Sequence, residues 1–192
     1  MHEPKNHSGL VRGVETVGNI SEADINVMMA TNVTGLINMT QLILPIFHSR
    51  GRGDIINVGS IAGREPYPGG SIYCATKAAV RSFTDSLRRE LISTRIRVIG
   101  IDPGQVETEF SVVRFRGDKD KADSVYAYVV FYLFLPALHL LTAVGSGCEP
   151  LTPEDIAEII VFAAGRRENV VLTDMIVYPN HQAGVAAIYK KT

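Results

Sequence analysis

The chain has 192 residues, a length that suits one domain with a sizeable hydrophobic core, and we treat residues 1–192 as a single domain. Hydrophobic residues make up 46% of the sequence and charged residues 20%, which is typical of an ordinary globular protein. The net charge of −1 gives no electrostatic reason to expect a nucleic-acid partner.

The cysteines and the first residues indicate a reducing compartment. Cys74 and Cys148 have neither disulfide nor metal-ligand spacing, so we expect no metal site. Residues 1–8 lack the apolar stretch of a signal peptide. The expected location is therefore the cytoplasm.

The predicted elements alternate between helices and strands. A capping-box-like pattern at Ser21 opens a helix over 22–47, which Pro45 should bend or end. Predicted strands over 54–58, 97–101 and 170–177 alternate with helices over 71–92 and from Pro153 to about Gly165. This order is typical of an α/β fold with a Rossmann-type parallel sheet.

Ser60, Tyr73 and Lys77 have the spacing of a proton-transfer site. Ser60 follows the carboxyl end of the strand over 54–58, and Tyr73 and Lys77 share one face at the start of the next helix. A nearby ammonium favours the phenolate, so Tyr73 could exchange protons with an alcohol or a carbonyl. A Tyr-x-x-x-Lys spacing also occurs by chance, and Ser60 is what gives it weight.

With further motifs, the chain resembles the classical short-chain dehydrogenases/reductases, from about residue 9 to the C-terminus. The matching motifs are Thr31-Asn32-Val33, Asn57-Val-Gly-Ser60, Tyr73-Cys-Ala-Thr-Lys77 and Pro103-Gly104-Gln-Val106-Glu-Thr108. The resemblance implies that Tyr73 is the general acid/base, that Lys77 lowers its pKa and holds the cofactor ribose, and that Ser60 orients the substrate oxygen.

The resemblance also implies roles for residues outside this trio. Asn32 would be catalytic by holding a relay water behind Lys77, and with Tyr73 and Lys77 it would border the cofactor. The segment Pro103, Gly104, Val106 and Thr108 would hold the nicotinamide end of that cofactor. The alternatives are a satisfied polar residue in a helix for Asn32 and a helix cap for Thr108.

The segment Glu107–Asp118 and the stretch Leu151-Thr-Pro-Glu-Asp155 resemble a subgroup, the NADP-dependent 3-hydroxy acid (serine-type) dehydrogenases. This implies reversible oxidation of a small 3-hydroxy acid to a 3-oxo acid with NADP, NAD being the alternative. Arg114 and Arg116 are candidate clamps for the substrate carboxylate, since a guanidinium fork fits a carboxylate; the alternative is two surface arginines. A homo-oligomer, dimer or tetramer, would form through the helices over 22–47 and 71–92.

The resemblance covers only the C-terminal portion of the family fold. In the family, a Gly-rich turn after the first strand places a pyrophosphate at a helix N-terminus. This chain has no counterpart of those βαβ units. Its Gly51-Arg-Gly53 cannot be that turn, because it precedes a strand instead of following one. The sheet would then have an unpaired edge. We therefore expect weak or no cofactor binding by this chain, with a catalytically silent fragment that acts only by association as the alternative function.

An apolar insertion covers about residues 128–146. The stretch has no charged residue, and its length approaches the roughly 20 residues that span a bilayer. Three interpretations are open: a membrane anchor, an apolar lid over the substrate, and the translation of an intron. We favour the third, because removing 128–146 joins Ser124-Val-Tyr-Ala127 to Gly147-Cys-Glu-Pro150 as one family-like loop, and membrane attachment through 128–146 is the alternative location.

Overall fold

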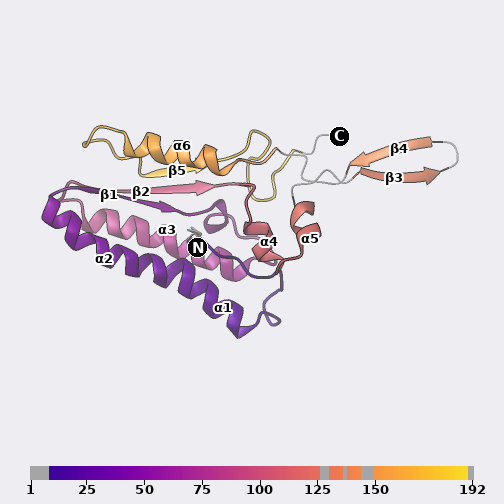
Figure 1. Cartoon of the computed structure of the whole chain (residues 1–192), viewed down its shortest axis with the longest axis horizontal. Coiled ribbons are helices and arrows are strands. Elements are labelled where there is room, and N and C mark those ends of the chain that lie inside the picture. The colour runs from indigo at the N-terminus through magenta and orange to yellow at the C-terminus, as the bar shows by residue number, and fades with distance from the viewer. Residues whose placement is uncertain (1–8, 126–129, 136–137, 144–148, 190–192) are drawn as a thin grey trace, which may run out of the picture.

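A computed structural model describes residues 9–125, 130–135, 138–143 and 149–189 (Figure 1). Its elements are, in chain order, α1 (Glu22–Met29), η1 (Ala30–Thr34), α2 (Gly35–Arg50), β1 (Gly53–Val58), η2 (Ile61–Gly63), α3 (Ser71–Glu90), β2 (Ile96–Pro103), α4 (Phe110–Arg114), α5 (Lys119–Ser124), β3 (Val130–Leu135), β4 (Leu138–Ala143), α6 (Pro153–Ala164) and β5 (Asp174–Val177). Cys148 and the flanks of the hairpin β3–β4 lie outside the described residues.

The central sheet has the order β1-β2-β5, and both neighbouring pairs are parallel. Helices connect the strands, α3 between β1 and β2 and α6 between β2 and β5, because parallel strands need a crossover. Figure 1 shows α2 and α3 on one side of the sheet and α6 on the other. This confirms the α/β fold and the Rossmann-type sheet.

Strand β2 carries the core of the molecule. It is apolar over most of its length and almost entirely buried, as expected for a strand that is covered on both faces. On one face, Val98 packs with Leu87 of α3. On the other face, Ile99 and Ile101 pack with Ala163 of α6. The two clusters hold the carboxyl ends of β1 and β2 in fixed positions.

The first helical run extends further than predicted. Ser21 caps α1 by accepting a hydrogen bond from the Asp24 N–H, as the sequence indicated. Pro45 lies inside α2, and the helix continues to Arg50. Gly51 ends it, with a φ of 71° that glycine adopts at little cost. Of the two outcomes expected at Pro45, a bend or an end, the helix does not end there.

The last strand is shorter than predicted, since β5 covers only residues 174–177 of the expected 170–177. Before it, the Val170 carbonyl accepts a hydrogen bond from the Arg97 side chain. The Thr173 carbonyl accepts both from the Gly100 N–H of β2 and from the Arg88 side chain. Two short helices, α4 and α5, lie in the segment after β2, where the sequence indicated only a loop.

The described part of the apolar insertion is an antiparallel hairpin. Its strands β3 and β4 pair from Val130 with Ala143 to Leu135 with Leu138, and Figure 1 shows the hairpin projecting away from the sheet. Residues 130–135 and 138–143 are therefore strands and not parts of a spanning helix. Among the described residues, the run Glu22–Arg50 alone has the length and apolar composition of a membrane-spanning helix, properties that core helices of soluble proteins share.

Candidate active site

Two elements bring Ser60 and Tyr73 together. Ser60 follows the carboxyl end of β1, and Tyr73 lies in the first turn of α3. The two side chains are joined by a hydrogen bond. The Tyr73 side chain is buried, with the Phe110 ring packed edge-on at a centroid distance of 5.3 Å. The phenol therefore lies at the carboxyl edge of the sheet, where parallel α/β proteins bind ligands.

The electrostatics of this pair differ from the sequence-based expectation. Burial raises the pKa of Tyr73, and the hydrogen bond with Ser60 and the charge of Arg114 lower it to a smaller extent. The expectation was that Lys77 lowers this pKa, but the cost of desolvating the phenolate outweighs the nearby charges. Burial therefore favours the protonated phenol at Tyr73.

Lys77 lies on the same face of α3 as Tyr73. Its ammonium donates a hydrogen bond to the Val58 carbonyl at 3.1 Å and lies 5.8 Å from the centroid of the Tyr73 ring. Burial lowers the pKa of Lys77 from 10.5 to about 8. Gly9 passes so close that a Cβ on it would lie 2.9 Å from Lys77 Nζ, so a side chain at this position would displace the ammonium.

Asn32 links the segment before α1 to α3. Its Oδ1 accepts from the Leu10 N–H at 2.6 Å, and its Nδ2 donates to the Leu10 carbonyl at 2.7 Å and to Thr76 Oγ1 at 3.0 Å. The residue sits in η1, a π-helical turn of the kind that is frequent at functional sites. The buried side chain of Asn32 thus has hydrogen-bond partners, and one of them, Thr76, directly precedes Lys77 in the sequence. The role of Asn32 in a water relay stays a prediction.

The segment after β2 is fixed by Gln182, which the sequence analysis did not single out. Gln182 Oε1 accepts from the Gln105 N–H at 2.8 Å, and a Cβ on Gly104 would lie 2.3 Å from the same oxygen. Val106 forms a parallel bridge with Leu151. A long-range contact of this kind leaves no local signal in the sequence.

Thr108 lies just before the start of α4, whose cap position is Glu109. Its Oγ1 accepts from the Phe110 N–H at 3.1 Å, and the residue is exposed. Thr108 is therefore next to the cap position and not at it. Contact with a nicotinamide carboxamide stays a prediction for Thr108, and equally for Pro103, Gly104 and Val106.

The two candidate arginines have different surroundings. Arg116 is held by carboxylates, with its Nη2 at 3.0 Å from Asp24 Oδ2 and 3.2 Å from Glu15 Oε1. Arg114 lies over the Tyr67 ring at 5.4 Å, and its Nε is buried without a hydrogen-bond partner among the described residues. An unsatisfied guanidinium nitrogen is costly, so Arg114 is the arginine that is suited to an anion.

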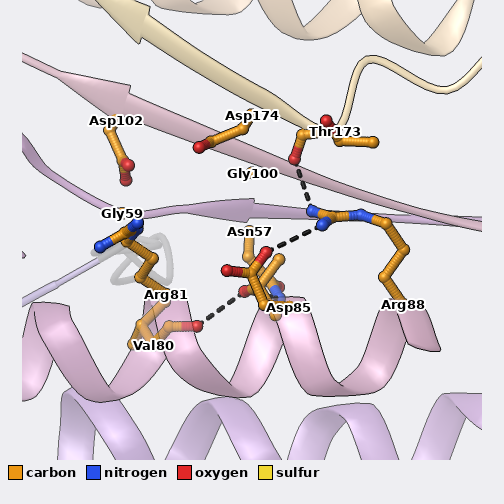
Figure 2. A pocket seen from close by; sticks show the side chains of 11 residues that line it. Asn57, Gly59, Val80, Arg81, Asp85, Arg88, Gly100, Asp102, Thr173 and Asp174 are labelled. Atoms are coloured by element: carbon orange, nitrogen blue, oxygen red, sulfur yellow. Dashed lines mark hydrogen bonds and ion pairs between the residues drawn. The ribbon is translucent and has the colours of Figure 1, made fainter. Parts of the chain in front are cut away.

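Asp102 positions Ser60 and was also not singled out from the sequence. Its Oδ1 accepts from the Ser60 N–H at 3.0 Å, and its Oδ2 pairs with Arg64 Nε at 2.7 Å. Arg64 also pairs with Asp174 of β5. Figure 2 shows Asp102 and Asp174 on neighbouring strands above Gly59, where a Cβ would lie 1.9 Å from Asp102 Oδ1. The network thus connects Ser60, after β1, to the carboxyl end of β2 and, through Arg64, to the first residue of β5.

These residues fit one end of a nicotinamide cofactor. Tyr73 and Lys77 are the hydroxyl and ammonium that could hold a ribose, and the buried Oε1 of Gln105 has no hydrogen-bond partner among the described residues. No cluster of three or more metal-ligating side chains occurs within the described part of the chain. The described site thus has donors for proton transfer and for an anion.

Comparison with known proteins gives a consistent picture. Residues 6–118 match the family model described as short chain dehydrogenase. The NADP-dependent 3-hydroxy acid dehydrogenase of Schizosaccharomyces pombe is 52% identical over 186 residues, and that of Escherichia coli K12 is 38% identical over 179 residues. These matches cover 97% and 93% of this chain, which spans 64% of the length of either relative.

A solved structure shows the same relation. The closed form of serine dehydrogenase complexed with NADP+ superposes with a TM-score of 0.77 at 37% identity. The match covers 96% of this chain and 67% of that one.

Proposed function

The chain belongs to the short-chain dehydrogenase family, and we propose on that premise that it carries the catalytic site of an NADP-dependent oxidoreductase for small 3-hydroxy acids. The names of the relatives support the cofactor and the substrate class. The observation that carries the proposal is the hydrogen bond between Ser60 and Tyr73 at the carboxyl end of β1. The proposed compartment is the cytoplasm, which suits the free, buried Cys74.

The protein residues supply the proton chemistry. NADP, when bound, supplies hydride transfer. In the reduction direction Tyr73 donates its proton to the oxygen of the 3-oxo acid, and its raised pKa keeps the phenol protonated until substrate arrives. Ser60 holds the same oxygen and stabilises the charge that develops on it. In the oxidation direction Tyr73 first loses its proton to solvent, and the phenolate Oη then accepts the proton of the substrate hydroxyl.

Arg114 is the residue that we propose to bind the carboxylate of the substrate. Arg114 lies beside Tyr67. Burial raises the pKa of Tyr67, and the charge of Arg114 lowers it to a smaller extent. The unpartnered Nε of Arg114 can donate to a carboxylate. Since Asp24 and Glu15 already neutralise Arg116, we propose Arg116 as a support of the loop and Arg114 as the clamp.

Replacing Tyr73 tests the proposal. The Tyr73→Phe variant keeps the ring but lacks the transferable proton, so turnover of serine with NADP+ should fall by about a hundredfold to ten-thousandfold. Absorbance at 340 nm at saturating NADP+ measures the rate, because weak cofactor binding by this chain stays a prediction. The control is Tyr189→Phe, at an exposed tyrosine, which should keep the full rate. Unchanged turnover in Tyr73→Phe would refute this assignment of the acid/base.

A further inference from the structure

A second cavity lies at the amino ends of the strands, away from the candidate active site. Its volume is about 680 Å³, and its lining comes from the end of α2, the starts of β1 and β2, and the end of α6 with the residues after it. Gly53 and Asp54 at the start of β1 belong to this lining, whereas Ser60 follows the other end of the strand. A strand rises about 3.3 Å per residue, so the length of β1 from Gly53 to Ser60 places the two sites roughly 20 Å apart.

The lining of this cavity is strongly basic. Five arginines face two acidic residues, Asp54 and Glu168, which leaves an excess of three positive charges (five minus two) on a chain with a net charge of −1. The arginines are Arg50, Arg52, Arg95, Arg97 and Arg166. We call this site the arginine cavity.

Arg97 and Asp54 form the neutral part of the arginine cavity. Arg97 donates to both carboxylate oxygens of Asp54, at 2.5 Å from Nε and 2.8 Å from Nη2. Its remaining hydrogen bonds go to the main-chain carbonyls of Ala164, Arg166 and Val170, at the end of α6. The charge of Asp54 is therefore matched by Arg97 and does not neutralise the other arginines.

The other guanidinium groups are largely uncommitted. Arg95 lies 3.7 Å from Glu168, and both side chains are exposed, so this pair contributes little. Arg166 uses its Nε for the Phe162 carbonyl, and its guanidinium lies 4.0 Å from the centroid of the Phe162 ring. The side chains of Arg50 and Arg52 make no hydrogen bond or ion pair with any residue in the described part of the chain. Like charges held together in this way repel one another unless an anion joins them.

We propose that the arginine cavity binds a small soluble diphosphate, a ligand distinct from the cofactor at the active site. A guanidinium fork donates in parallel to two oxygens of one phosphate, and two linked phosphates would match the excess of three charges. The volume lies in the range of small-molecule sites, roughly 300–1,000 Å³, and exceeds the need of a single phosphate. The proposal does not depend on the activity of the chain.

Calorimetric titration with inorganic pyrophosphate at low ionic strength tests the proposal. The wild-type protein should bind, Arg52→Ala should weaken binding at least about tenfold, and the double variant Arg50→Ala/Arg52→Ala should abolish it. The control is Arg81→Ala, which removes the same charge from an exposed position on α3 outside the cavity and should keep the affinity. Binding should persist when NADP+ is saturating.

Several results would overturn the proposal. These are the absence of binding by the wild-type protein, an equal loss in Arg81→Ala, and displacement of pyrophosphate by NADP+. Binding only to vesicles that contain phosphoinositides would assign the site to a lipid headgroup and equally contradict a soluble ligand. Circular dichroism checks the folding of each variant. Failure of Arg52→Ala to fold would contradict the statement that the Arg52 side chain has no partner in the described part of the chain.

Discussion

At the scale of single residues, burial decides the chemistry of the candidate active site. Tyr73 and Lys77 are both buried, so the uncharged form of each is favoured. The spacing of Ser60, Tyr73 and Lys77 predicted which residues share the site, but the sequence carries no measure of desolvation. The raised pKa of Tyr73 could therefore be seen only in the fold.

Arg114 and Arg116 provide a matched pair of variants. Arg114→Gln should raise the KM for 3-hydroxy acids by about tenfold to a hundredfold, because a carboxylate would lose a charged donor. Arg116→Gln should leave that KM within about twofold, since Asp24 and Glu15 already hold this side chain. Steady-state kinetics with serine measure both. A larger effect from Arg116→Gln would assign the clamp to the other arginine.

Lys77 should make stability depend on pH. Its pKa is about 8 in the folded protein and 10.5 as the ordinary value, so the unfolded chain binds more protons between these limits. Stability should therefore rise with pH in this window, by about 2 kcal/mol between pH 7 and pH 9.5 from this residue alone.

Urea unfolding of the wild type, Lys77→Met and Lys121→Met measures this contribution. Lys77→Met should lack the rise, whereas Lys121→Met, which changes an exposed lysine, should keep it. The same slope in all three proteins would show that Lys77 is not the source.

At the scale of elements, the sequence predicted the strands and the long helices better than the links between them. The alternation of apolar runs indicated β1, β2 and α3, and the capping threonine indicated α6. Helices of five or six residues, such as α4 and α5, have too few turns to show periodicity. Arg88 donates to the Val98 carbonyl at 3.0 Å and ties α3 to β2, a contact that the helical pattern of α3 does not indicate.

Arg97 is the corresponding link between the sheet and α6. Replacement by alanine would leave the Asp54 carboxylate and three carbonyls at the end of α6 without their donor. Arg97→Ala should therefore lower the free energy of unfolding by about 3 kcal/mol. Arg95→Ala, at the exposed arginine two residues earlier, should lower it by less than about 1 kcal/mol. Equal losses in urea unfolding would contradict this role.

At the scale of the whole molecule, two features remain without a partner among the described residues. Helix α2 exposes Met39, Leu42 and Ile46, which suits the expected homo-oligomer, and the oligomeric state stays a prediction. The hairpin β3–β4 projects from the sheet (Figure 1), and its interpretation as a lid or as a translated intron stays a prediction. Neither feature contributes a residue to the candidate active site.

The central proposal is that this chain oxidises a 3-hydroxy acid at C3 with NADP+. The most direct measurement incubates the purified protein with NADP+ and serine deuterated at C3, and determines the mass of the reduced cofactor. The account predicts NADPH that carries one deuterium, and no such product with Tyr73→Phe. Reduced cofactor without deuterium, or no reduced cofactor at saturating NADP+, would contradict the claim.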